Sequence, residues 1–307
     1  MKNLITILLL SIGLSVNAQI ATNGTNNSGS DASAIGNGTT ASGEYSTAMG
    51  RYSTASGNYG TAMGYQTTAS GIFSTAMGYR TEANQYYSTA MGQETNASGT
   101  NSTAMGEYTT ASGNYSTAMG RGTTASDYAS TVIGHYNSSG STATSAGSLS
   151  GSAPAFVIGN GFGSAGRSDA FKVMFNGDAT VSNDLTVNGD VTVSSDARLK
   201  ANIVSLGATL SKLLNIDGKT YTVKKNGAQK IGVLAQDIQE VFPELVSEDN
   251  EGILSVNYQG LIPVLINALK EQEQKFRLQE ERFQAQQEKF QEQEERLQAL
   301  ERILSKE

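Results

Sequence analysis

A repeat of 14 residues is the feature that most restricts what this chain can fold into. From residue 35 to residue 134, an apolar residue and a following glycine return every 14 positions without a gap. The apolar column consists of Ile35, Met49, Met63, Met77, Met91, Met105, Met119 and Ile133. A unit this short cannot bury a hydrophobic face by itself, so successive units must stack as the coils of a solenoid.

Each repeat holds two short segments of small and β-branched residues. One has the form Ser-Thr-Ala-Met-Gly, as at 46–50, and the other the form Thr-Ala-Ser-Gly, as at 54–57. Both end in glycine, which adopts the positive φ of a tight turn without steric cost. We expect the Met and Ile column to form a continuous buried ridge, with the variable positions after each glycine facing solvent. Because one methionine per coil makes a thin core, the coils should need partner chains.

This paired pattern resembles the head repeat of YadA-like trimeric adhesins, and we place these repeats at residues 35–140. The resemblance implies a left-handed parallel β-roll, three copies of which pack into a trimer. Such a head would offer a surface for a host-surface, matrix or glycan ligand. No segment of the chain resembles the C-terminal membrane anchor of those adhesins, so the means of surface retention stays open.

The first 18 residues are expected to be a secretory signal peptide. Lys2 precedes an apolar run from Leu4 to Val16, and a small-residue cleavage site ends at Ala18. Residues 19–34 would form an N-terminal linker. No second apolar run is long enough to cross a bilayer as a helix, so the mature protein is predicted to be secreted or held at the cell surface without a transmembrane helix.

Composition excludes several classes of chemistry. The chain has no cysteine and one histidine, His135, which removes thiol nucleophiles, multi-histidine metal sites and most catalytic triads. Its formal net charge is -7, so it lacks the basic footprint of a nucleic-acid-binding protein. We therefore expect neither a cofactor nor a metal. His135 falls in the variable column and is expected to be exposed.

Residues 141–193 are predicted to form a linker followed by a β neck. Strands are expected at 155–159 and 171–175. Asn-Gly-Asp turns at 176–178 and 188–190 separate short runs in which apolar residues alternate with polar ones as far as Val193. A neck with so few apolar side chains would need partner chains to cover it.

Residues 195–260 are expected to form a small α+β domain, and residues 261–307 a coiled coil. In the domain, leucines between 206 and 214 indicate one helix, 220–233 a hairpin around the turn 225–227, and 234–242 a second helix. In the last segment, one apolar column recurs every seven residues and the column three residues later is mostly glutamine. The apolar column consists of Leu269, Phe276, Phe283, Phe290, Leu297 and Leu304. Bulky phenylalanines favour three or more strands over two. The expected fold is thus mainly β and fibrous.

The motif Ser-Asp-x-Arg-Leu-Lys-x-Asn-Ile at 195–203 lies where the neck meets this domain. Together with Ile-Gly-Val-Leu-Ala-Gln at 231–236, Pro-Glu-Leu-Val at 243–246 and Val-Asn-Tyr at 256–258, it resembles the endosialidase-type intramolecular chaperones at the C-termini of phage tail spikes and bacterial surface fibres. The resemblance implies a domain that trimerises, helps the preceding fibre to fold in register and then cuts itself off.

By the same resemblance, Ser195 is the nucleophile, Lys200 its general base, and the scissile bond joins Ser194 to Ser195. A serine and lysine can perform this chemistry without histidine or cysteine if the lysine is desolvated. Asp196 and Asn202 are candidate supporting groups, with Asn202 a possible oxyanion donor, and Asp196 could equally form a structural ion pair with Arg198.

Three other readings stay open. The C-terminal domain could be a permanent trimerisation cap without proteolysis on an adhesin. A phage-derived tail fibre is disfavoured by the signal peptide. A hydrolase acting on other molecules is least favoured, because the sequence shows no polar cluster beyond the Ser-Lys pair.

Overall fold

The computed structural model describes residues 23–249 and 252–305. The signal peptide expected at 1–18 and the start of the following linker lie outside these residues. The chain forms two compact units that divide between Val191 and Thr192, and each is described by itself.

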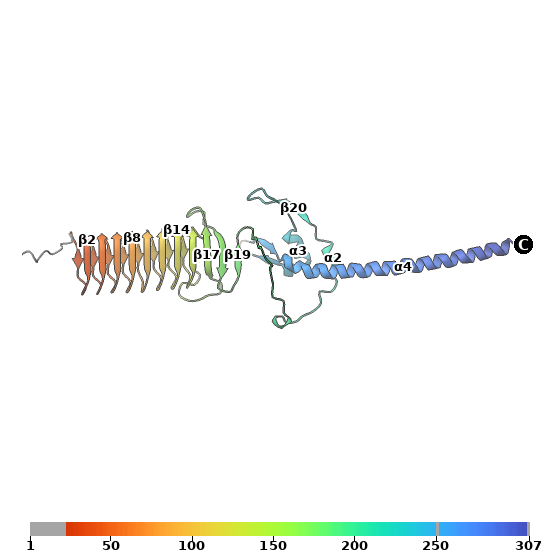
Figure 1. Cartoon of the computed structure of the whole chain (residues 1–307), viewed down its shortest axis with the longest axis horizontal. Coiled ribbons are helices and arrows are strands. Elements are labelled where there is room, and N and C mark those ends of the chain that lie inside the picture. The colour runs from red at the N-terminus through yellow and green to blue at the C-terminus, as the bar shows by residue number, and fades with distance from the viewer. Residues whose placement is uncertain (1–22, 250–251, 306–307) are drawn as a thin grey trace, which may run out of the picture. The chain divides into compact units, whose positions relative to one another are not determined.

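The N-terminal unit contains the solenoid expected from the repeat, with one long and one short strand in each coil (Figure 1). The long strands are β2 (Ser33–Asn37), β4 (Thr47–Arg51), β6 (Thr61–Tyr65), β8 (Thr75–Tyr79), β10 (Thr89–Gln93), β12 (Thr103–Glu107), β14 (Thr117–Arg121) and β16 (Thr131–His135). The short strands are β1 (Asn26–Asn27), β3 (Thr40–Ala41), β5 (Thr54–Ala55), β7 (Thr68–Ala69), β9 (Glu82–Ala83), β11 (Asn96–Ala97), β13 (Thr110–Ala111) and β15 (Thr124–Ala125).

Neighbouring coils pair in parallel, and each residue lies opposite the residue 14 positions later in the sequence. Met91 of β10 lies opposite Met105 of β12, and Gly92 lies opposite Gly106. The short strands form one eight-stranded sheet, and the long strands belong to an eleven-stranded sheet. Every column of the repeat therefore becomes a straight row along the solenoid.

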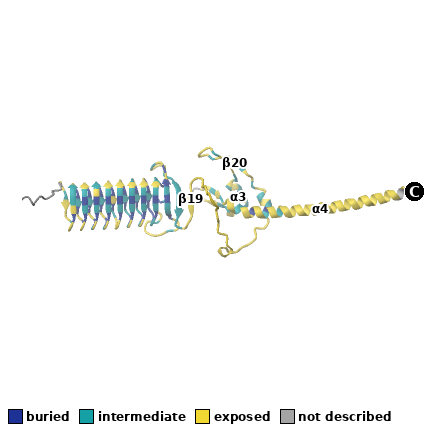
Figure 2. Cartoon of the chain, in the orientation of Figure 1, coloured by how far each residue is buried: buried dark blue, intermediate teal, exposed yellow. Residues whose placement is uncertain are grey.

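Alanines, not methionines, form the core of the solenoid. Two alanine columns are fully buried, one in the long strands just before each methionine and one in the short strands, with Val132 continuing the first (Figure 2). The methionines are only half-buried, and Met63 is 37% exposed. The expected buried methionine ridge is thus wrong, because strand side chains alternate between faces and the alanine takes the inner one.

The glycine after each methionine permits the coils to approach closely. Gly106 has φ +126°, and a Cβ atom at this residue would lie far inside van der Waals contact with the carbonyl oxygen of Gly120 in the next coil. Glycine is therefore required at this position for two reasons: the positive φ of its backbone and the close approach of the next coil.

The strands expected in the neck exist, but the first continues the solenoid. Strand β17 (Pro154–Asn160) pairs in parallel with β16, so that Val157 lies opposite Val132. Strands β18 (Asp169–Met174) and β19 (Ala179–Val181) then add in antiparallel order. The structure has no strand in residues 182–193, where Leu185 is 70% exposed. The alternating apolar residues of this segment, from which strands were predicted, are exposed in the single chain.

The C-terminal unit is small and partly irregular. Its elements before the last helix are η1 (Ala197–Leu199), α2 (Leu210–Leu213), β20 (Lys219–Thr222), β21 (Gln229–Gly232), α3 (Ala235–Val241), η2 (Pro243–Leu245), β22 (Val246–Glu248), β23 (Leu254–Val256) and η3 (Tyr258–Gly260). The expected hairpin, β20 with β21, and the second helix, α3, are confirmed. The first helix is shorter than expected because Leu206 lies outside it and is exposed. Ile238, Phe242 and Val264 form the centre of the core.

The unit ends in α4 (Leu261–Leu304), a helix of 44 residues. At 1.5 Å per residue it is about 66 Å long. Its heptad residues from Leu269 to Leu297 are all exposed in the single chain (Figure 2). No helix among the described residues is both long and apolar enough to span a membrane.

Candidate functional site

The Ser195–Lys200 segment is shaped by one turn of 3-10 helix. The carboxylate of Asp196 caps the turn by accepting a hydrogen bond of 2.9 Å from the backbone N–H of Arg198. At the other end, the N–H of Lys200 donates to the carbonyl of Ala197 at 3.1 Å. Aspartate is among the residues favoured at such a cap, so the local sequence accounts for the turn.

This turn brings the predicted nucleophile and base together. The Nζ atom of Lys200 donates a hydrogen bond of 2.6 Å to the Oγ atom of Ser195. This distance is within the range through which a general base removes the proton of a serine nucleophile. Ser194, which supplies the carbonyl of the predicted scissile bond, directly precedes Ser195.

The pair is open to solvent in the single chain. Ser194, Ser195 and Lys200 are all exposed. A lysine accepts a proton most readily when burial disfavours its charged form. The geometry of the site is therefore present in one chain, whereas the desolvation that the chemistry needs is not.

Asp196 and Arg198 form a two-pronged ion pair. The Nη2 and Nε atoms of Arg198 donate to Oδ2 and Oδ1 of Asp196 at 2.7 Å and 3.0 Å. These bonds, with the one from the Arg198 backbone, hold the pKa of the Asp196 carboxyl below its ordinary value. The Asp196 carboxylate therefore orders the turn through its bonds with Arg198.

Two other residues considered from the sequence lie apart from this pair. Asn202 has a left-handed backbone, φ +52°, and its side chain makes no hydrogen bond to Ser195 or Lys200. His135 is half-buried, against expectation, with its Nδ1 atom 2.5 Å from the carbonyl oxygen of Gly161. Among residues 23–249 and 252–305, no three acidic or histidine side chains cluster in a way that could hold a metal ion.

Sequence reasoning missed Glu271, which ties α4 to the start of α2. The Glu271 carboxylate accepts hydrogen bonds from the backbone N–H groups of Thr209 and Leu210, the second at 3.2 Å. These bonds, led by that from Thr209, lower the pKa of Glu271. No local sequence pattern predicts this contact, because Thr209 and Glu271 are 62 residues apart.

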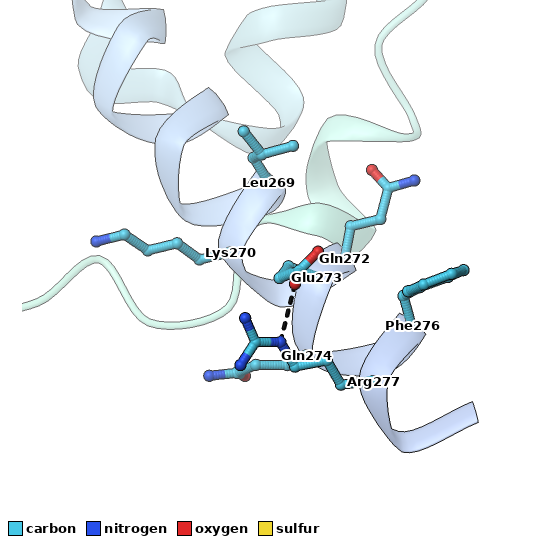
Figure 3. A pocket seen from close by; sticks show the side chains of 7 residues that line it. All are labelled: Leu269, Lys270, Gln272, Glu273, Gln274, Phe276 and Arg277. Carbon is cyan, nitrogen blue, oxygen red and sulfur yellow. Dashed lines mark hydrogen bonds and ion pairs between the residues drawn. The ribbon is translucent and has the colours of Figure 1, made fainter. Parts of the chain in front are cut away.

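The exposed face of α4 carries a series of shallow grooves between its own side chains. The first is lined by seven residues: Leu269, Lys270, Gln272, Glu273, Gln274, Phe276 and Arg277 (Figure 3). Four of them, Leu269, Gln272, Glu273 and Phe276, are spaced i, i+3, i+4 and i+7. Figure 3 shows Leu269, Gln272 and Phe276 along one side of the helix and Lys270 on the other, and its dashed line is the 2.8 Å ion pair of Glu273 with Arg277. Two further grooves follow along the Phe276, Phe283 and Phe290 row. Four residues at this spacing form the hole that accepts a side chain of a partner helix in a coiled coil.

Comparison with known families agrees with both halves of this description. Residues 195–247 match the family described as chaperone of endosialidase. Residues 28–53, 55–81, 83–109 and 111–137 match the YadA head domain repeat. The chain is therefore a fibrous protein that carries YadA head repeats followed by an endosialidase-type chaperone domain.

One curated relative is the long tail fiber protein Gp37 of Escherichia phage AR1. It is 38% identical to this chain over 84 residues. The alignment covers 24% of this chain and 8% of the phage protein. The relation therefore concerns a small part of a much longer fibre protein.

Proposed function

We propose that the chain forms a homotrimeric, secreted or surface-held fibre whose C-terminal domain drives trimerisation and in-register folding and then releases itself by cutting between Ser194 and Ser195. The observation that carries the proposal is the 2.6 Å hydrogen bond between Lys200 Nζ and Ser195 Oγ, at the start of the segment that matches the chaperone family. The proposal rests on this geometry together with the unpaired surfaces of both units.

The cleavage step follows from these two side chains. Ser195 Oγ attacks the carbonyl carbon of Ser194 as Lys200 Nζ takes the hydroxyl proton. The C–N bond then breaks, the α-amine of Ser195 leaves with a proton from Lys200, and Ser194 is held as an ester on Ser195 Oγ. Water hydrolyses the ester, which leaves a carboxylate on Ser194 and a new N-terminus at Ser195.

Two surfaces support association of the chain with copies of itself. The outward faces of the long strands present half-buried threonine and methionine rows, such as Thr89 with Met91. The α4 helix presents a row of exposed leucines and phenylalanines with coiled-coil grooves. An isolated helix this polar would be marginally stable in water, so partner helices are the expected cover.

The regular head explains why a chaperone would be needed. Successive coils pair identical residues, alanine with alanine and methionine with methionine, along most of the solenoid. Chains that associate one coil out of register would therefore recover nearly all of their contacts. Three chains that the C-terminal domain holds together start in register. Once cleavage has removed that domain, unfolding is hard to reverse.

The test is expression from residue 19 to residue 307 followed by a denaturing gel and N-terminal sequencing. We expect a fragment that begins at Ser195, absent from the Ser195→Ala and Lys200→Ala variants and present in a Ser205→Ala control. An uncut wild-type chain that still trimerises would overturn the protease claim. That result would favour the second candidate, a permanent trimerisation cap. The solvent exposure of the Ser195 and Lys200 side chains supports this candidate.

A further inference from the structure

An exposed ladder of aromatic rings runs along the length of the solenoid. Each of four successive coils contributes one ring from the same position of the repeat. Tyr45, Tyr59, Phe73 and Tyr87 occupy one column of the repeat, just before the long strands. Their ring centroids are 5.2, 4.6 and 5.1 Å apart in order, and successive planes differ by 18° or less. Each residue is between 45% and 55% exposed. The ladder covers three coil spacings, about 14 Å.

The backbone at these positions does not favour aromatic residues. All four have φ between +54° and +58°, the left-handed region in which asparagine and glycine are most easily accommodated. Asn101 occupies the same column in the coil after Tyr87, with φ +56°. The column therefore accepts a small polar residue. Tyr115, also in this column, and Tyr52, Tyr108 and Tyr136 at other turns have positive φ as well, so what distinguishes the ladder is the stacking of four consecutive rings.

The rings expose their edges and hydroxyl groups more than their faces. Because Tyr59 and Phe73 are stacked on both sides, their faces are covered by neighbouring rings. Ring edges carry partial positive charge and attract electron-rich oxygen atoms, and tyrosine hydroxyls both donate and accept hydrogen bonds. Rings this close leave no slot for a proline ring, so a proline-rich peptide does not fit between them.

The turns that carry the ladder are almost uncharged. At 42–45, 56–59, 70–73 and 84–87 they contain one charged residue, Glu44, and apart from the ladder rings the rest are serines, glycines, asparagines, a glutamine, Ile72 and Tyr86. The nearest further charge is the carboxylate of Glu82, which accepts a hydrogen bond from Asn84. Asn58 and Asn84 lie in these turns and add amide groups. A neutral, oxygen-rich partner suits this surface, whereas a nucleic acid or another polyanion has no cation to contact.

We infer that this ladder binds a neutral, linear β-linked polysaccharide that runs along the solenoid, with about one sugar for each coil. An extended pyranose unit is close to the coil spacing in length, so its hydroxyl and ring oxygens would meet successive ring edges in register. The ladder forms within a single chain and does not depend on cleavage. Binding by the uncleavable Ser195→Ala chain therefore separates failure of this inference from failure of the proposed function.

The test is affinity electrophoresis of the full chain in native gels that contain hydroxyethylcellulose, xylan or glucomannan. The ladder variant is Tyr59→Asn with Phe73→Asn, residues that the backbone accepts at this column. The matched control is Tyr65→Gln with Tyr79→Gln, which removes a second stacked pair, 5.3 Å apart, at the other end of the long strands, where Gln93 occupies the same column.

We expect at least one of the three polysaccharides to retard the wild-type chain and the control equally. The ladder variant should bind about tenfold more weakly, in keeping with the loss of two aromatic contacts. Retardation by none of the three would overturn the inference. Equal retardation of the ladder variant and the wild-type chain would also overturn it.

Discussion

Lys200 donates a 2.6 Å hydrogen bond to Ser195 while both side chains remain open to water. Burial favours the neutral form of a lysine that a general base needs, and in the single chain this pair is not buried. The arrangement suggests that partner chains complete the site by covering it, so that cutting would follow assembly.

Cleavage should therefore depend on the coiled coil. Phe283→Asp places a carboxylate in the apolar row of α4 and should keep the chain monomeric, because the charge would be buried between helices. We expect the cleavage rate to fall at least about a hundredfold, the scale of a lost general base. Size-exclusion chromatography and denaturing gels over time measure both effects.

Gln274→Asp provides the control for this variant, since Gln274 is outside the two columns of the heptad. It should trimerise and cut like the wild-type chain. Full cleavage by a monomeric Phe283→Asp chain would show that one chain suffices.

The methionine face of the head should be a contact between chains. Met91→Lys places a charge in the half-buried outward row of β10 and should shift the protein from trimer to monomer. Gln93→Lys, two residues along the same strand but in the exposed column, should leave the trimer intact. Sedimentation velocity distinguishes the two, and an unchanged Met91→Lys trimer would place the interface elsewhere.

Close stacking of the coils should make Gly106 intolerant of any side chain. In Gly106→Ala the new methyl group would overlap the backbone of Gly120, and the residue would keep a strained positive φ. We expect a loss of at least about 3 kcal/mol in the free energy of unfolding. Gly163→Ala, where a Cβ atom meets open space, is the matched control. Denaturant titration compares them, and equal midpoints would contradict this packing.

Glu271 should make the C-terminal unit sensitive to acid. Its pKa in the folded chain is lowered from an ordinary 4.5 by the N–H groups of Thr209 and Leu210. The folded state therefore binds the Glu271 proton less tightly than the unfolded state. The stabilisation is present above about pH 4.5 and is lost as pH falls through the lower folded pKa.

Glu271→Gln should lower the melting temperature at pH 7 and flatten its dependence on pH below 4.5. Glu273→Gln, which removes only an exposed ion pair within α4, should change neither by much. A melting temperature of Glu271→Gln equal to that of the wild type at pH 7 would show that the cap contributes nothing. Circular dichroism at a series of pH values is the measurement.

Much of the architecture follows from local sequence. The period of 14 predicts the coils, the seven-residue period predicts α4, and Lys-Asn-Gly at 225–227 predicts the turn between β20 and β21. The spacing from Ser195 to Lys200 allows one turn of helix to join them, and Asp196 is the residue that caps it. Each of these depends on interactions between residues close in sequence.

The rung formed by β17 also has a local signal, although it was not predicted as part of the solenoid. Phe-Val-Ile-Gly at 156–159 repeats the pattern of Thr-Val-Ile-Gly at 131–134, which marks β17 as a further rung. Its distance of 25 residues from the previous rung, where every other rung follows after 14, concealed it.

The sequence alone determined that the chain coils, how often, and where its long helix and its Ser-Lys motif lie. Only the tertiary structure decided which column faces inward. A strict period repeats every column equally, so it cannot distinguish Met91 from the neighbouring Ala90. The inner column packs against the buried alanines of the short strands, and the larger methionine takes the outward face. The contact of Glu271 with Thr209 likewise arises only when distant segments pack together.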